Sequence, residues 1–239
     1  MPKIVAKKHT ARRRLSPAQR RRQIVIAAVH YFADVGFDGG TRALAKKIGV
    51  TQPLIYRYFP SKEDLIREVY KEVYLRRWRP EWEDLISDRS IPLRERLIVF
   101  YERYMEAIFT PEWIRIYLFS GLRGIGINQW WISFIEDRVL RKIGAEIRHT
   151  YKLPDLNKTP IQKAELDLYW VLHGGIFYYG VRQHVYEMRP HLELASFIEL
   201  SIDSLLTGLP SAISRIFDEA NHSRYQLDTE RPDSLLSDR

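Results

Sequence analysis

The stretch GVTQPLIYRYFPSK (Gly49–Lys62) decides the fold, because it places a helix of scarcely two turns between two turn signals. Gly49 is expected to end one helix and Thr51 to begin the next. Ile55 and Phe59 are four residues apart, so they share one helical face and are predicted to point inward. A small surface helix that carries hydrogen-bond donors and little acid needs a partner. The residues on its outward faces are Gln52, Pro53, Tyr56 and Arg57.

The segments around this stretch also follow a helical pattern, and no run alternates as a half-buried strand would. Ser16 and Gln19 predict a capping box at the start of a first helix, and Gly36 predicts its end. Thr41 and Thr51 are predicted to cap a second and a third helix, which a tight turn joins. Three helices with this turn form a helix-turn-helix, whose third helix lies in the major groove of DNA.

The charge of the chain is concentrated at its N-terminal end. Residues 1–80 hold 19 Lys/Arg and 6 Asp/Glu, whereas residues 81–239 hold 19 Lys/Arg and 24 Asp/Glu. A basic front on an acidic body indicates that only the front meets a polyanion. The first 23 residues carry nine Lys/Arg and no acid, which predicts an arm that is disordered when free and able to order on phosphates.

Composition excludes several classes of protein. The chain has 239 residues and no cysteine, so it has no disulfide framework and no thiolate metal site, as is typical of a reducing cytoplasm. No secretory signal follows the basic N-terminus, and the most apolar segment, Leu168–Val181, is too short and too interrupted to span a bilayer. A cytoplasmic protein with no membrane partner is expected.

The run TRALAKKIGVTQPLIYRYF (Thr41–Phe59), with Gly36 before it and Pro60-Ser61-Lys62 after it, closely resembles the N-terminal domain of TetR-family transcriptional regulators. The shared pattern has a Thr-capped second helix, Gly-Val before a small polar cap, then Tyr-x-Tyr-Phe and a lysine one turn on. The resemblance covers residues 17–70. Two departures, Ile48 and Leu54, indicate changes in packing and in base preference.

The resemblance implies DNA contacts for seven residues. Glutamine can pair with adenine, a proline ring can touch a thymine methyl group, and tyrosine hydroxyls and lysine can hold phosphates. Arg42 would contact backbone or base at the start of the second helix. For Tyr58 the alternative is packing against the first helix, and for Lys62 it is a merely solvated side chain. The seven are Arg42, Thr51, Gln52, Pro53, Tyr56, Tyr58 and Lys62.

The resemblance makes the remaining two thirds of the chain a helical ligand-binding and dimerisation domain, whose last two long helices pair across a two-fold axis. Gly174 and Gly175 inside a helix would each cost about 1 kcal/mol relative to alanine, which close helix approach would offset; a plain kink is the alternative. Helices are predicted near Pro92–Phe109, Pro111–Arg123, Gln129–Tyr151, Pro160–Glu187 and Leu192–Leu206, with an extra turn to Ile216.

Aromatic residues are abundant in this region, and most aromatic residues at helical spacing belong to a core. A pocket between helices is nevertheless usually apolar with few polar groups. Six residues are predicted to line one, which favours an apolar or aromatic effector, neutral or cationic, over a sugar phosphate. They are Trp113, Tyr117, Trp131, Trp170, His173 and Phe177.

Other binding and catalytic patterns fail. The glycines of GLRGIGIN (Gly121–Asn128) follow no strand, so they do not form a nucleotide-binding loop. His173 and His184 are eleven residues apart on one helix, too far to share a metal directly. No catalytic constellation stands out, so no enzyme, cofactor or metal is expected.

The sequence therefore predicts an all-α protein with a helix-turn-helix DNA-binding domain followed by a helical ligand-binding and dimerisation domain. Its expected function is that of a homodimeric repressor that a small-molecule effector releases from a palindromic operator in double-stranded DNA. The alternatives are a ligand-blind architectural DNA-binding protein and an enzyme in the C-terminal domain. The expected bounds are a basic flexible arm at 1–15, the DNA-binding domain at 16–62 with its motif at 40–59, a connecting helix at 63–80, the ligand-binding and dimerisation domain at 81–220, and a flexible tail at 221–239.

Overall fold

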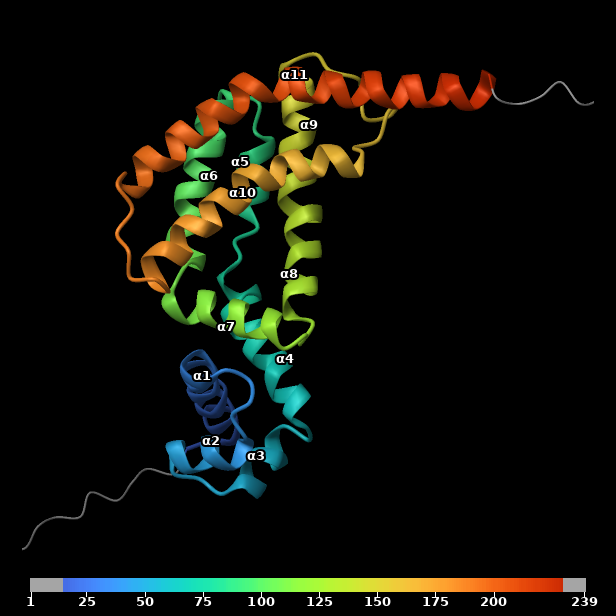
Figure 1. The fold of residues 1–239 in the computed structure, drawn as a ribbon. Coiled ribbons are helices and arrows are strands. Elements are labelled where there is room, and N and C mark those ends of the chain that lie inside the picture. The colour runs from blue at the N-terminus through green and yellow to red at the C-terminus, as the bar shows by residue number, and fades with distance from the viewer. Residues whose placement is uncertain (1–14, 230–239) are drawn as a thin grey trace, which may run out of the picture.

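The computed structural model describes the backbone of residues 15–229 and the side chains of residues 15–218. Every regular element in these residues is helical, which confirms the predicted all-α class. A small N-terminal unit lies at one end, and a larger helical body lies above it (Figure 1). The helices are α1 (Pro17–Val35), α2 (Thr41–Ile48), α3 (Gln52–Tyr58), α4 (Lys62–Val73), α5 (Glu81–Ser87), α6 (Leu93–Ile108), α7 (Pro111–Leu122), α8 (Ile127–Ile135), α9 (Arg141–Thr150), α10 (Lys163–His184) and α11 (Leu194–Thr229).

The helix starts in the N-terminal unit follow the sequence with one exception. The capping box at α1 is present: Ser16 Oγ accepts from the Gln19 backbone N–H at 3.2 Å, and Gln19 Oε1 accepts from the Ser16 N–H at 2.9 Å. The prediction that Thr41 caps α2 is wrong, because Gly40 is the N-cap and the Thr41 hydroxyl faces α3 instead. Thr51 holds the N-cap position of α3 without a side-chain cap bond.

The turn between α2 and α3 depends on Gly49. Its φ of 68° and ψ of 37° place it in the left-handed region, which glycine enters without a Cβ penalty. The turn sends α3 across α2, so that Ile55 and Phe59 are buried as predicted. They share a core with Phe32 of α1 and Leu44 of α2. Packing of this kind leaves the opposite face of α3 free.

The helical body differs from the sequence prediction at several ends. The expected connecting helix stops at Val73, a 3-10 turn follows at Leu75–Arg77, and α5 was not predicted. The expected helix at Gln129–Tyr151 is continuous, but it contains a π-helical turn at Glu136–Leu140 between α8 and α9. α11 runs past the expected end at Leu206 and past the expected extra turn to Ile216, with Pro210 inside the helix.

Gly144 on α9 permits a close helix approach. A Cβ added there would lie 2.7 Å from Tyr169 Cε2 on α10, so only glycine fits. At Gly174 and Gly175 an added Cβ meets nothing within 4 Å. Within the described chain no other helix comes close to these two glycines, and close approach across a dimer interface stays a prediction.

The helical body holds the N-terminal unit through α7, which packs against α1. Arg115 of α7 donates from Nε to the Ala33 carbonyl at 2.6 Å and from a terminal nitrogen to the Asp34 carbonyl at 3.4 Å. The Phe119 ring covers Gly36, where an added Cβ would lie 3.2 Å from the ring. An arginine and an aromatic ring of α7 therefore fix the last turn of α1.

The predicted basic arm at 1–15 lies outside the described residues, apart from Leu15. Of the predicted flexible tail, residues 221–229 continue the backbone of α11, and residues 230–239 lie outside the description. In Figure 1 the C-terminal part of α11 extends beyond the other helices of the body. Among the described helices, none combines the length and the apolar character that crossing a membrane requires.

Candidate nucleic-acid interface and ligand cavity

The outward face of α2 and α3 carries most of the predicted DNA contacts. Arg42, Thr51, Pro53 and Tyr56 are exposed, and Gln52 is partly exposed. Thr51, Gln52 and Pro53 lie at the start of α3, Arg42 lies at the start of α2, and Tyr56 follows the buried Ile55 on α3. Five of the seven predicted residues are therefore accessible on these two helices.

A hydroxyl network joins α2 to α3 beneath this face. Gln52 Nε2 donates to Thr41 Oγ1 at 2.9 Å, and Thr41 Oγ1 lies 3.0 Å from the Tyr56 hydroxyl. An amide nitrogen only donates, so Thr41 accepts from Gln52 and is free to donate its own proton to Tyr56. When Thr41 donates, the hydroxyl hydrogen of Tyr56, a residue that is 40% exposed, is available to an outside acceptor.

The two remaining predicted residues have partners within the chain. Tyr58 is partly buried and packs against the hydrophobic core. Lys62, also partly buried, donates from Nζ to the Phe37 carbonyl in the loop after α1. A DNA contact from either residue would come from a side chain that already has a packing or anchoring role.

Two exposed cations on the same unit are absent from the seven predicted DNA contacts. Lys46 lies in the last turn of α2, and Arg57 lies in the last turn of α3. The signal that could have found Lys46 as a contact is its place beside the turn between the two helices. Arg57 lies at the other end of α3, on an outward face that the sequence predicted. Lys47 differs because its Nζ is 2.7 Å from Asp34.

A cavity of about 550 Å³ between α10 and α11 is not the predicted pocket, because none of the six predicted residues lines it. The predicted pocket lies deeper, in a separate cavity of about 360 Å³. The deeper cavity, called here the aromatic cavity, is walled by α7, α8 and α10. All six residues predicted to line a pocket line it, and the sequence missed two more. Its lining is Trp113, Tyr117, Trp131, Ile132, Trp170, His173, Gly174 and Phe177.

Its walls are built from stacked rings. The Trp113 and Tyr117 rings are one helical turn apart on α7 and stack with centroids 5.2 Å apart and planes within 7°. Phe177 of α10 meets Tyr117 edge-on at 5.2 Å. Such contacts hold the rings in fixed orientations, so the cavity presents a rigid apolar wall.

His173 is the titratable group of the aromatic cavity. It is 5% exposed, and burial lowers its pKa from 6.5 to about 4, so the ring is neutral at pH 7. Its Nε2 lies 3.5 Å from the Tyr104 hydroxyl. Trp170, beside it, donates from Nε1 to Glu136 at 3.0 Å. No Lys, Arg, Asp or Glu lines the cavity among the described residues.

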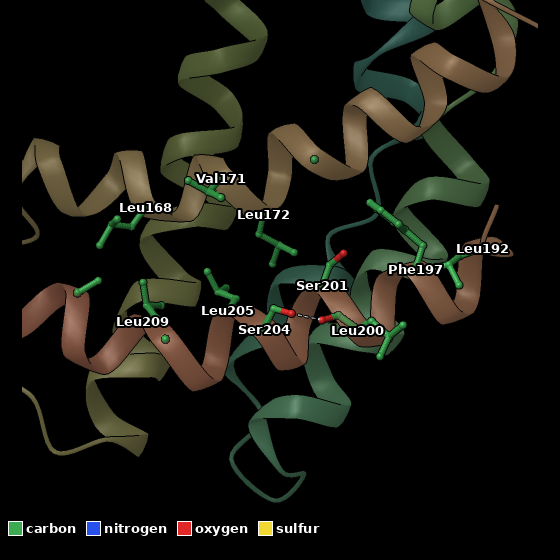
Figure 2. Close-up of a pocket in the computed structure, with 13 residues that line it drawn as sticks. Leu168, Val171, Leu172, Leu192, Phe197, Leu200, Ser201, Ser204, Leu205 and Leu209 are labelled. Carbon is green, nitrogen blue, oxygen red and sulfur yellow. Dashed lines mark hydrogen bonds between the residues drawn. The ribbon is translucent and has the colours of Figure 1, made fainter. Parts of the chain in front are cut away.

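The more open hollow is an apolar groove between α10 and α11, shown in Figure 2. Leucines from both helices face each other across it, and Val171 and Leu200 on its edge are exposed. Its serines add little polarity, since Ser204 donates its hydroxyl to the Leu200 carbonyl of its own helix at 2.8 Å. An exposed apolar groove of this kind marks an interaction surface.

α10 separates the groove from the aromatic cavity. Gly174 lines the cavity and Gly175 lines the groove, so consecutive glycines of one helix line two different hollows. α7 has a comparable double role, because Trp113 and Tyr117 line the cavity while Arg115 holds α1. Two walls of the aromatic cavity therefore have a second role: α10 also forms the groove, and α7 also contacts the DNA-binding unit.

Known proteins resemble this chain in its N-terminal helices and in its fold. Residues 24–69 match the family described as "Bacterial regulatory proteins, tetR family". The HTH-type transcriptional regulator LuxR of Vibrio harveyi is 31% identical over 108 residues, which are 44% of this chain and 52% of that protein. The chain thus matches about half the length of this curated relative.

Solved structures resemble the fold over most of the chain. A TetR-like transcriptional regulator from Rhodococcus sp. RHA1 is 24% identical with a TM-score of 0.56, covering 82% of this chain and 100% of that one. A TetR-family regulator from Mesorhizobium loti is 16% identical with a TM-score of 0.52, covering 81% and 98%. At these identities the similarity concerns the fold alone.

Proposed function

We propose that this chain, whose residues 24–69 match the TetR family of helix-turn-helix transcriptional regulators, binds a palindromic operator as a homodimer and that a small molecule in the aromatic cavity releases it. The observation that carries the proposal is the double role of α7, which walls the cavity with Trp113 and holds α1 with Arg115. A ligand that moves α7 would thereby move the DNA-binding unit. In this role the protein is a cytoplasmic repressor.

The proposed DNA contacts divide into two kinds. Gln52 and Pro53, at the start of α3, read base edges, and Thr51 supports them there. Arg42 and Tyr56 hold phosphates from the exposed face, and Lys62 and Tyr58 brace the same face while reaching the backbone at its edge. The Thr41 hydroxyl orients both Gln52 and Tyr56 before DNA arrives.

Dimerisation through the groove between α10 and α11 supplies the second half-site. One helix-turn-helix reads few bases, and two recognition helices about 34 Å apart read half-sites one helical turn apart. An apolar groove on two adjacent long helices suits a two-fold interface, because such an interface brings the same face of both copies together and would bury the exposed apolar side chains on each. The ligand would act by changing the separation of the recognition helices.

Selection of bound fragments from random DNA tests this function. We expect the selected DNA to contain an inverted repeat, and sedimentation should show two chains bound per duplex. An enriched single half-site bound by one chain would contradict the dimer. Binding without sequence preference and without release by any compound would identify an architectural DNA-binding protein instead.

A further inference from the structure

The aromatic cavity contains two buried polar atoms that have no hydrogen-bond partner in the described part of the chain. They are Trp113 Nε1 and His173 Nδ1, and both belong to side chains that line the cavity. Trp113 is 1% exposed and His173 is 5% exposed. A buried donor or acceptor without a partner costs about 1–3 kcal/mol, so a ligand that pairs with these atoms would gain affinity from them.

The hydrogen-bond order around His173 fixes what its free nitrogen offers. A side-chain hydrogen bond from Trp131 lowers the pKa of Tyr104, and the Tyr104 hydroxyl lies 3.5 Å from His173 Nε2. An indole only donates, so Tyr104 accepts from Trp131 and keeps its own proton to donate to Nε2. A neutral imidazole that accepts at Nε2 carries its hydrogen on Nδ1. In this order His173 Nδ1 is a donor, as Trp113 Nε1 is.

The charge of the lining decides the charge of the ligand. A cation would leave both N–H donors unpaired. A carboxylate would meet the donors, but among the described residues that line the cavity there is no lysine or arginine to offset its burial. The carboxylate of Glu136, bonded to Trp170 Nε1, further disfavours an anion. An uncharged acceptor avoids both costs.

We infer that the aromatic cavity selects an uncharged, ring-containing molecule with a carbonyl-type oxygen that accepts hydrogen bonds from Trp113 Nε1 and His173 Nδ1. This inference rests on the proposed function, because it names the class of effector that the cavity takes. The rings stack against Trp113, Tyr117 and Phe177, and the oxygen satisfies the two free donors.

Four naphthalene probes of one shape test the inference by calorimetric titration of the full chain at pH 7. They are 2-acetylnaphthalene (a ketone), 2-isopropenylnaphthalene (its alkene counterpart), 2-naphthoate (an anion) and 2-naphthamidine (a cation). We expect the ketone to bind about tenfold more tightly than the alkene, the factor that corresponds to about 1.4 kcal/mol, and more tightly than both ions. Equal binding of ketone and alkene, no binding of the ketone, or tightest binding of either ion would overturn the inference.

A variant removes one donor while keeping an aromatic ring. Trp113→Phe should reduce the preference for ketone over alkene to about threefold or less, as expected when one of two hydrogen bonds is lost. The matched control is Trp130→Phe, since Trp130 is 47% exposed and lines a different cavity. An unchanged preference in Trp113→Phe, or an equal loss in the control, would contradict the assigned donor.

The operator experiment separates this inference from the proposed function. If the ketone binds as expected but leaves operator affinity unchanged, the cavity chemistry stands and the regulatory function fails. If 2-naphthoate alone releases the operator, the function stands and the uncharged-ligand inference fails.

Discussion

Arg115 Nε lies 2.6 Å from the Ala33 carbonyl oxygen and donates a hydrogen bond to it, so a helix that walls the aromatic cavity caps the end of α1. The side chain reaches across from the ligand-binding body to the DNA-binding unit. Carbonyls in the last turn of a helix lack partners within that helix, and a guanidinium satisfies them well. The contact therefore provides a short physical route between cavity and DNA.

Replacing Arg115 should weaken the coupling between cavity ligand and operator DNA more than it weakens binding of the ligand itself. In Arg115→Met a cavity ligand, found by quenching of tryptophan fluorescence, should bind as in the wild type. The factor by which that ligand weakens operator binding should fall about tenfold, a loss of about 1.4 kcal/mol of coupling. Fluorescence anisotropy of labelled operator measures it. Arg103→Met, at an exposed arginine of α6, is the control, and equal effects of both variants would exclude the Arg115 route.

The adjacent glycines of α10 predict opposite phenotypes. Gly174→Leu should fill the aromatic cavity, abolishing ligand binding while leaving the dimer and operator affinity in place. Gly175→Leu should fill the groove and give a monomer with weak operator binding. Both positions have open space for a side chain, so each chain should fold. Sedimentation and operator binding distinguish them, and one shared phenotype would show that α10 does not separate two sites.

Tyr56 and Arg42 should differ in their salt dependence. Tyr56→Phe removes an uncharged donor, so affinity should fall on all sequences without a change in the slope of log K against log salt. Arg42→Ala removes a cation at the phosphates, so that slope should shrink by roughly 1. Affinity measured at several salt concentrations tests both. Unchanged binding by both variants would remove this face from the interface.

Gln52 should determine sequence preference. Gln52→Ala should cost about 1–3 kcal/mol on the preferred operator and relax the choice of base at one position in each half-site. Binding to operators mutated at each position measures the effect. A loss of equal size on every sequence would make Gln52 a backbone contact or a purely structural partner of Thr41.

His173 should make stability depend on pH. Burial among the rings of Tyr101, Tyr104 and Trp170 lowers its pKa to about 4, against about 6.5 when unfolded. The unfolded chain therefore binds this proton more readily, so the contribution to stability is complete above pH 6.5 and is lost as the pH falls toward 4.

Urea unfolding at pH 7 and pH 5 measures that loss. Between pH 7 and pH 5 the free energy of unfolding of the wild type should fall by about 2 kcal/mol more than that of His173→Phe. The other histidines are present in both proteins, so their contributions cancel in the comparison. Equal losses in the two proteins would contradict the burial of a neutral His173.

The sequence predicted the aromatic cavity well for a simple reason. Trp113 and Tyr117 are four apart on one helix, as are His173 and Phe177, so each pair shares a face. Ile132 and Gly174 were missed because an aliphatic residue and a glycine carry no chemical signal for a pocket. Only the packing of α8 against α7 and α10 brings them to its wall.

The missed details come from tertiary contacts. Thr41 was predicted to cap α2, but its hydroxyl pairs with Tyr56 on α3. The sequence shows no partner for Lys62, but its Nζ donates to the Phe37 carbonyl in the loop after α1. Gly208 and Pro210 are ordinary stop signals, but α11 continues through them. Local propensity cannot report partners that lie far away in the chain.

Reciprocal linkage tests the central claim most directly. The affinity of a cavity ligand, defined as one whose binding Gly174→Leu abolishes, is measured calorimetrically for the free protein and for the operator-bound protein. If cavity occupancy releases DNA, operator must weaken ligand binding by the same factor as the ligand weakens operator binding; a hundredfold effect corresponds to about 2.7 kcal/mol. We predict two equal factors well above one. Ligand affinity that is identical with and without operator would contradict the account.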